Sequence, residues 1–128
     1  MPSYRLIFPV PEGTQLESAE TAHVTTEEGT APEAQISGYQ VAGKTGTANQ
    51  INPLTGKYFG GGFVSSFIGM VPAKHPKLLA EVVLEKPQTN HFGGTVAGPV
   101  FHKVMSFALQ SLGIAPSGGH KPTFPLHW

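Results

Sequence analysis

The sequence predicts an α+β domain in which an antiparallel meander of about three strands carries a C-terminal helix packed on one face. Three segments with the composition of strands come first, at 39–47, 65–71 and 78–86. A segment with near-helical spacing of its apolar residues follows, at 97–112. The last two strands are joined by only a few residues, and such a short connection favours antiparallel neighbours.

Local composition supports each of the three strands. The segment 39–47 contains two glycines, which weaken a helix, together with Val and Thr, which favour strands. The turn signals Asn52-Pro53 and Thr55-Gly56 then predict a long loop, and Pro72 ends the second strand. The third strand, LLAEVVLEK, is apolar enough to be buried on both faces.

The predicted helix has its own start and stop signals. Thr95 can cap it, Pro99 suits its first turn, and Gly113 can end it. Its predicted apolar stripe consists of Val96, Val100, Val104, Phe107 and Leu112. Phe101, Met105 and Ala108 widen this stripe.

The flanking regions have weaker patterns. Residues 11–37 are polar without a period, which predicts a surface-exposed connection with one helical turn near Leu16–Ala22. Tyr4–Val10 has the composition of a short strand. The tail after Gly113 is rich in Pro and Gly and is predicted to be irregular and on the surface.

Composition excludes several classes of function. The 128 residues suffice for one domain, and the formal net charge of zero gives no reason to expect nucleic acid or an anionic membrane as a partner. Because cysteine is absent, disulfides, zinc–thiolate sites and a cysteine nucleophile are excluded. Four histidines without metal-ligand spacing (His91, His102, His120 and His127) give no reason to expect a metal, and no cofactor is expected. No apolar run approaches the ~20 residues of a membrane span, and the N-terminus lacks the features of a signal peptide.

The stretch GYQVAGKTGTA at 38–48 fits two motifs. One is G-x-x-x-x-G-K-[ST], the phosphate-binding loop of nucleotide hydrolases. The other is K-T-G, a motif of the serine acyl-transfer enzymes that react with penicillin. A phosphate loop must open a helix, but GTANQINPLTG is a poor helix start, and the sequence has no Asp to hold magnesium.

A strand at K-T-G has a clear chemical use. Thr45 and Thr47 project to one face, where their hydroxyls can hold a carboxylate, and Gly46 lets a substrate backbone approach. Lys44 supplies a positive charge near a reacting carbonyl, and the Thr47 N–H can point at the developing oxyanion. A solvated edge strand with an incidental lysine is the simpler alternative for K-T-G taken alone.

The context of the motif strengthens the catalytic interpretation. The run GTAPEAQISGYQVAGKTGTANQ, a glycine-rich loop and FVSSFIGMVPA strongly resemble the C-terminal part of the transpeptidase domain of class B penicillin-binding proteins, especially the division-type members. The resemblance spans residues 28–113, between a divergent N-terminal segment (1–27) and the tail (114–128). It implies part of the fold shared by penicillin-binding proteins and serine β-lactamases.

The resemblance also implies an activity. These enzymes are serine D,D-transpeptidases that cross-link peptidoglycan by acyl transfer and bind β-lactams, so the ligand would be a stem peptide or a β-lactam. By resemblance, Lys44 steers and polarises, Thr45 and Thr47 bind the carboxylate, and the Thr47 N–H forms half of the oxyanion hole. A complete family protein of this kind would act in the cell envelope, outside the cytoplasm.

Two motifs of the family are missing. None of the eight serines has Lys three places on, so S-x-x-K is absent, as is S-x-N. The chain therefore contains no nucleophile and is expected to be inactive alone. The family's helix between an E-T-A-like segment and the G-T-A segment is also shortened, since Glu20 and Gly29 are close in sequence. A non-catalytic remnant or a partner-binding module is the alternative function.

In the complete family domain, the strand at 78–86 pairs with a strand from the part that this chain lacks. An open apolar edge promotes association. We expect Tyr4–Phe8 or a second copy of the chain to cover this edge. An upstream transpeptidase fragment is a further possible partner.

Overall fold

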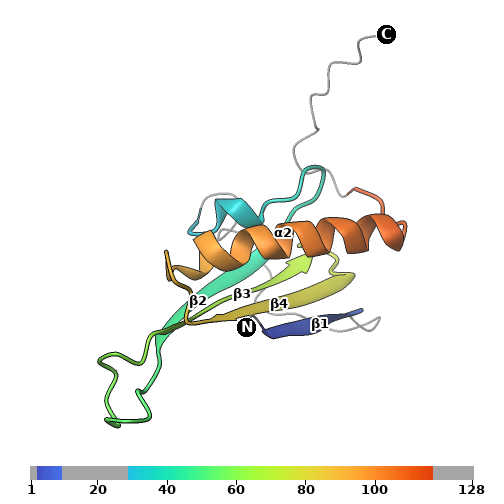
Figure 1. The fold of residues 1–128 in the computed structure, drawn as a ribbon. Helices are drawn as coiled ribbons and strands as arrows, with labels where there is room; N and C mark the ends of the chain where they lie inside the picture. The colour runs from blue at the N-terminus through green and yellow to red at the C-terminus, as the bar shows by residue number, and fades with distance from the viewer. Residues whose placement is uncertain (1–2, 10–28, 117–128) are drawn as a thin grey trace.

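The computed structural model describes residues 3–9 and 29–116. Four strands form one sheet in the order β1-β4-β3-β2, and the helix α2 lies across one face of it (Figure 1). The elements in chain order are β1 (Ser3–Pro9), the short 3-10 helix η1 (Pro32–Ala34), β2 (Ala42–Asn49), β3 (Phe63–Val71), β4 (Leu78–Glu85) and α2 (Gly93–Ser111). The predicted α+β class is therefore confirmed.

The predicted three-stranded meander is also confirmed. β2 pairs antiparallel with β3 from Ala42↔Met70 to Asn49↔Phe63, and β3 pairs antiparallel with β4 from Val64↔Glu85 to Val71↔Leu78. The strand ends differ from prediction by up to three residues, since β2 begins at Ala42 and β3 at Phe63.

The strand β1 covers the outer edge of β4, which is the first of the two alternatives expected, Tyr4–Phe8 or a second copy of the chain. It pairs antiparallel with β4 from Ser3↔Val83 to Pro9↔Leu78, and the register shifts between Arg5 and Phe8. The residues of this chain therefore supply the fourth strand themselves.

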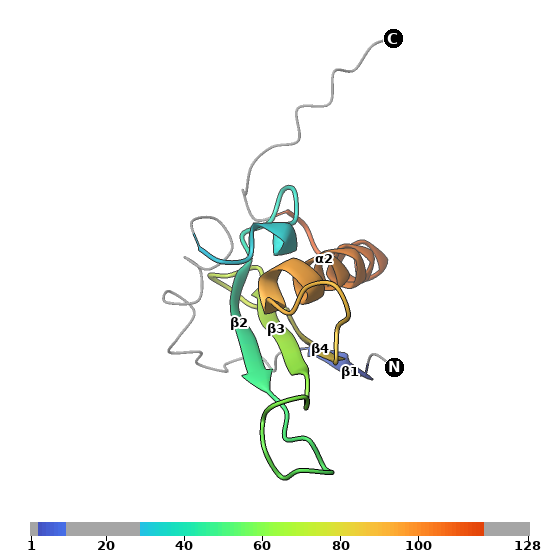
Figure 2. The same cartoon turned by 60° about the vertical axis from the view of Figure 1, so that its left-hand side comes forward.

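The hydrophobic core lies between the sheet and α2. Phe67 of β3 and Phe101 of α2 are fully buried, and their rings meet edge to face with centroids 4.8 Å apart. This geometry is favourable for aromatic pairs. Figure 2 shows η1 beside the start of α2, on the same side of the sheet. Most of the described part of the predicted surface connection at 11–37 is exposed, but Ala31, Ala34 and Ile36 are buried against the core.

The predicted start of the helix was wrong. α2 begins at Gly93 with Phe92 at its N-cap, and no side chain caps it, so Thr95 lies within the first turn. Pro99 lies inside the helix rather than in its first turn. Tertiary contacts override the local capping signals here, because Gly93 and Gly94 allow the helix to start directly against the sheet. The helix does end before Gly113, which has a φ of 63°.

The predicted apolar stripe of the helix was also wrong in part. Apart from glycines, the buried residues of α2 follow a spacing of four and are Ala97, Phe101, Met105 and Leu109. Val104, Phe107 and Leu112 of the predicted stripe are 40%, 72% and 63% exposed. Similarly, β4 alternates between buried and half-buried residues, so the prediction that both of its faces are buried was wrong.

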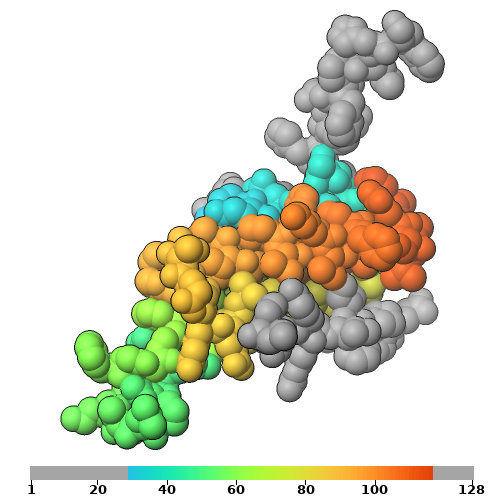
Figure 3. All heavy atoms as spheres, viewed as in Figure 1, coloured from blue at the N-terminus to red at the C-terminus, as the bar shows by residue number. Residues whose placement is uncertain are grey.

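The loop between β2 and β3 projects away from the sheet and helix (Figure 3). Its length confirms the long connection that the turn signals predicted. The predicted helical turn near Leu16–Ala22 and the tail beyond residue 116 lie outside the described residues.

Candidate functional site

The K-T-G motif lies inside β2, at the edge of the described sheet. Lys44, Thr45, Gly46 and Thr47 stand opposite Ile68, Phe67, Ser66 and Ser65 of β3. Because the motif continues as a strand rather than opening a helix, the phosphate-loop interpretation is wrong.

The two threonine hydroxyls of the motif lie on the face of the sheet that α2 covers. The N–H of Gly93, the first helical residue, donates a hydrogen bond of 3.2 Å to Thr47 Oγ1. The hydroxyls of Thr45 and Thr30 are 3.2 Å apart, a distance at which either can donate to the other. Three hydroxyl groups and a helix N-terminus are therefore gathered at one end of β2.

Gly93 and Gly94 make this arrangement possible. A Cβ on Gly93 would lie 2.2 Å from the carbonyl oxygen of Ser66 and 2.6 Å from that of Gly46. A Cβ on Gly94 would lie 2.2 Å from the carbonyl oxygen of Thr30. Any larger residue would push the helix away from the strand. The pair thus fixes the N-terminus of α2 beside the motif.

Lys44 and Gly46 belong to the opposite face of β2, because side chains alternate along a strand. Lys44 is exposed, and its Nζ donates a hydrogen bond of 2.8 Å to the carbonyl oxygen of Thr45. A Cβ on Gly46 would lie 2.5 Å from Ser66 Oγ. The charge of Lys44 therefore lies close to the backbone of the motif while remaining open to solvent.

Three contacts anchor the segment that leads into α2. The buried hydroxyl of Ser65 donates a hydrogen bond to the carbonyl oxygen of His91. The His91 ring stacks on Phe63 with centroids 4.0 Å apart. The Phe92 N–H donates to Asn90 Oδ1 at 2.9 Å. Together they hold the helix N-terminus in place over the ends of β2 and β3.

The sequence identified the motif but missed the residues around it. Thr30 was part of the quoted G-T-A segment, yet nothing local indicates that it meets Thr45, fifteen positions later. His91, Gly93 and Gly94 lie before the predicted helix at 97–112, and Ser65 is only the first residue of a predicted strand. Within residues 3–9 and 29–116, no group of His, Cys, Asp or Glu could hold a metal ion. In the same part of the chain, no helix combines the length and hydropathy required to cross a membrane.

Comparison with known proteins identifies the family of the chain. The model of a family described as the penicillin-binding protein transpeptidase domain matches residues 15–106, more than two thirds of the chain. The chain belongs to this transpeptidase domain family. The resemblance to class B penicillin-binding proteins that the sequence indicated is therefore confirmed.

Curated relatives match the chain over most of its length. A probable peptidoglycan D,D-transpeptidase PenA of Neisseria flavescens is 38% identical over 116 residues, covering 84% of this chain and 28% of that protein. Stage V sporulation protein D of Bacillus subtilis is 43% identical over 90 residues, covering 70% of this chain and 14% of that protein. The chain thus spans between about a seventh and about a quarter of the length of these two relatives.

Solved structures share the fold. The transpeptidase domain of Burkholderia pseudomallei penicillin-binding protein 3 aligns with a TM-score of 0.65 at 35% identity, covering 77% of this chain and 30% of that chain. Penicillin-binding protein 3 of Mycobacterium tuberculosis, in complex with ampicillin, aligns with a TM-score of 0.61 at 38% identity, covering 77% and 22%.

Proposed function

We propose that this chain provides the carboxylate-binding and oxyanion-binding strand of a serine D,D-transpeptidase. Such an enzyme cross-links peptidoglycan by acyl transfer and binds β-lactams. The proposal rests on one observation: Thr45, Thr47 and the N-terminus of α2 lie close together at one end of an edge strand. Family membership supports it, since the relatives include a probable peptidoglycan D,D-transpeptidase.

The hydrogen bonds leave the Thr47 hydroxyl able to bind a carboxylate. A hydroxyl has one donor hydrogen and two acceptor lone pairs. Thr47 Oγ1 accepts from the Gly93 N–H, so its own hydrogen is free to donate to an anion. When Thr30 donates to Thr45, the hydrogen of Thr45 is free in the same way. Both hydroxyls then present donors to one carboxylate.

Two positive elements favour an anion at this position. The N-terminus of α2 carries a partial positive charge from its aligned peptide dipoles, and Gly93 places it against β2. Lys44 adds a full charge on the exposed side of the same strand. A C-terminal carboxylate of a peptide, or the carboxylate of a β-lactam, has the matching charge.

The acyl-transfer step would use the backbone of the same strand. Attack by a serine hydroxyl on the scissile carbonyl places negative charge on its oxygen, and backbone N–H groups stabilise this charge. In the proposed site the Thr47 N–H supplies one of these donors. The serine and the base that takes its proton would come from outside this chain, because no serine here lies in S-x-x-K.

The missing S-x-x-K also supports a second candidate function, that of a non-catalytic binding module. In this case the chain would hold an anionic peptide or a partner without performing acyl transfer. Binding and acylation must therefore be measured separately.

The binding test is a titration of the isotopically labelled chain with N-acetyl-D-Ala-D-Ala, followed by amide chemical shifts. We expect saturable shifts at residues 44–47 and 93–94, with a dissociation constant on the order of millimolar, because the site is small and open to water. The methyl ester of the dipeptide, which lacks the carboxylate, should bind several-fold more weakly.

Variants at the motif and at a control position test whether the dipeptide binds at the K-T-G strand. The substitutions Thr45→Val and Lys44→Ala should each weaken binding at least three-fold, whereas Thr89→Val, the same change at an exposed threonine, should leave it unchanged. Shifts that are equal for the dipeptide and its ester, or insensitive to Thr45→Val, would overturn the proposal.

A further inference from the structure

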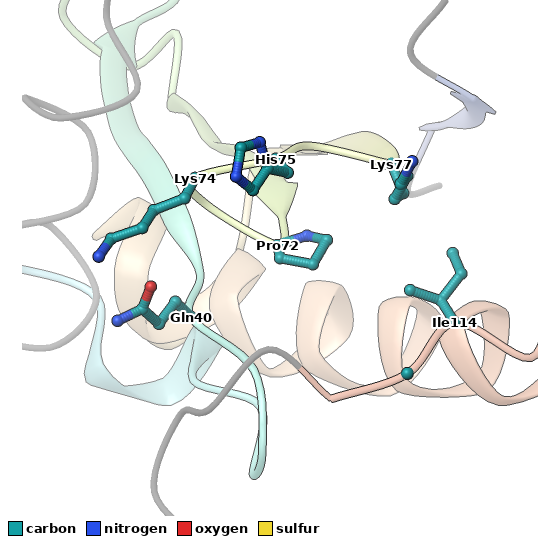
Figure 4. A pocket seen from close by; sticks show the side chains of 7 residues that line it. Gln40, Pro72, Lys74, His75, Lys77 and Ile114 are labelled. Atoms are coloured by element: carbon teal, nitrogen blue, oxygen red, sulfur yellow. The ribbon is translucent and has the colours of Figure 1, made fainter. Parts of the chain in front are cut away.

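A second concave site lies at the end of the sheet away from the K-T-G motif. The turn after β3 and the segment after α2 enclose a cavity of about 380 Å³, shown in Figure 4. The residues that line it are Gln40, Pro72, Lys74, His75, Lys77, Ile114 and Ala115. Thr45 pairs with Phe67, five positions before Pro72, so the two sites are about 17 Å apart along β3.

The walls of this cavity are fixed by hydrogen bonds. The Ala73 N–H donates to the carbonyl oxygen of Gln40 at 2.9 Å, and the Lys77 N–H donates to that of Val71 at 3.0 Å. On the other side, the Ile114 N–H donates to the carbonyl oxygen of Leu109 at 3.0 Å. Both walls are therefore preformed, which lowers the entropy lost when a ligand binds.

The cavity combines an apolar floor with a cationic rim. Pro72, Ile114 and Ala115 supply apolar surface, and the aliphatic stems of lysines extend such a surface while their ammonium groups stay in water. Lys74, His75 and Lys77 are exposed, and no Glu of the described chain is among the lining residues. The rim thus favours a negatively charged ligand with an apolar body.

The placement of the two lysines narrows the choice of ligand. Lys74 and Lys77 lie on opposite sides of Pro72, and Ile114 lies on the same side as Lys77 (Figure 4). A fatty acid has a single charged end and can satisfy only one of these lysines. A peptide with a bulky apolar residue between acidic residues presents carboxylates on both sides. The volume of about 380 Å³ is at the lower end of the range for small-ligand sites, about 300–1,000 Å³, and leaves room for a bulky apolar side chain.

We propose that this cavity binds an acidic peptide segment of a partner protein, with one bulky apolar side chain in the cavity and flanking carboxylates at Lys74 and Lys77. The site is separate from the carboxylate site of β2. A partner could therefore occupy it while the K-T-G strand holds its own ligand.

The test uses the full chain and a fluorescein-labelled peptide, Glu-Glu-Leu-Glu-Glu, followed by fluorescence anisotropy at low ionic strength. We expect saturable binding that weakens at least ten-fold in the double variant Lys74→Glu/Lys77→Glu. The matched control, Lys57→Glu/Lys103→Glu, makes the same change of charge at two exposed lysines elsewhere and should weaken binding less than three-fold. An equal loss in both variants would show a general charge effect and overturn the site.

Four further measurements test the proposal: a neutral peptide, a variant at Ile114, the dependence on salt, and the binding of decanoate. The neutral peptide Gln-Gln-Leu-Gln-Gln should bind at least five-fold more weakly than the acidic peptide. The variant Ile114→Ser should bind the acidic peptide at least five-fold more weakly than the unmodified chain does. Raising the salt concentration from 20 to 300 mM should weaken binding of the acidic peptide to the unmodified chain. Absence of saturable binding, or binding of decanoate that exceeds binding of the peptide, would overturn the proposal.

Discussion

Large apolar residues lie on both faces of α2, but in opposite environments. Phe101, Met105 and Leu109 on the inner face are fully buried, whereas Phe107 and Leu112 on the outer face are 72% and 63% exposed. What separates the faces is the size of the neighbouring residues. Small residues at Gly94, Ala97 and Gly98 bring the inner face against Thr30 and η1. Apolar spacing identifies a helix, but close approach by small residues decides which of its faces is buried.

The largest expected effect contrasts two phenylalanines on these faces. The substitution Phe101→Ala should destabilise the chain by about 3–5 kcal/mol, because it removes a buried ring and leaves a cavity against Phe67. Phe107→Ala should change the free energy of unfolding by no more than about 0.5 kcal/mol. Urea unfolding followed by circular dichroism measures both. Similar losses in the two variants would mean that the outer face is buried in solution.

A second contrast concerns two glycines at the motif. An alanine at Gly93 would meet the backbone oxygens of Ser66 and Gly46, which cannot move aside, so Gly93→Ala should cost about 1–3 kcal/mol. An alanine at Gly46 would meet only the Ser66 hydroxyl, which can rotate, so Gly46→Ala should cost less than about 1 kcal/mol. Thermal unfolding of both variants checks the order, and the reverse order would contradict the packing described for the start of α2.

The smallest expected effect tests the hydrogen bond between β2 and α2. Thr47→Val keeps the side-chain shape but removes the acceptor for the Gly93 N–H, which should destabilise the chain by about 1 kcal/mol. Amide exchange at Gly93 should become faster. In Thr89→Val, at an exposed threonine outside the strands and the helix, neither quantity should change. Unchanged exchange at Gly93 in Thr47→Val would show that this hydrogen bond does not form in solution.

Much of the fold follows from local sequence signals. Strand composition and turn residues predicted three strands and their order. The family resemblance indicated an open edge on the third strand, and the segment at 4–8 was one of the two candidates to cover it. The start of α2 and its buried face could not be predicted this way. They depend on contacts of Gly93 and Gly94 with residues from 27 to 64 positions earlier in the chain.

Part of the candidate site could likewise be predicted from local sequence, and part depends on tertiary contacts. K-T-G and its neighbours form a recognisable linear motif, so Lys44, Thr45, Gly46 and Thr47 could be named from the sequence. Thr30, Ser65 and His91 reach the site only through folding, and no local pattern distinguishes them from other polar residues. The motif therefore identified the candidate binding residues, but not the residues that hold them in place.

The central claim is that this chain carries the substrate-binding strand of an acyl-transfer enzyme without its nucleophile. The most direct test is to incubate the purified chain with a fluorescent penicillin and determine its intact mass. The account predicts no covalent adduct, because oxyanion stabilisation without a nucleophile and base gives only residual catalysis. A stoichiometric adduct that disappears in a single Ser→Ala variant would contradict it.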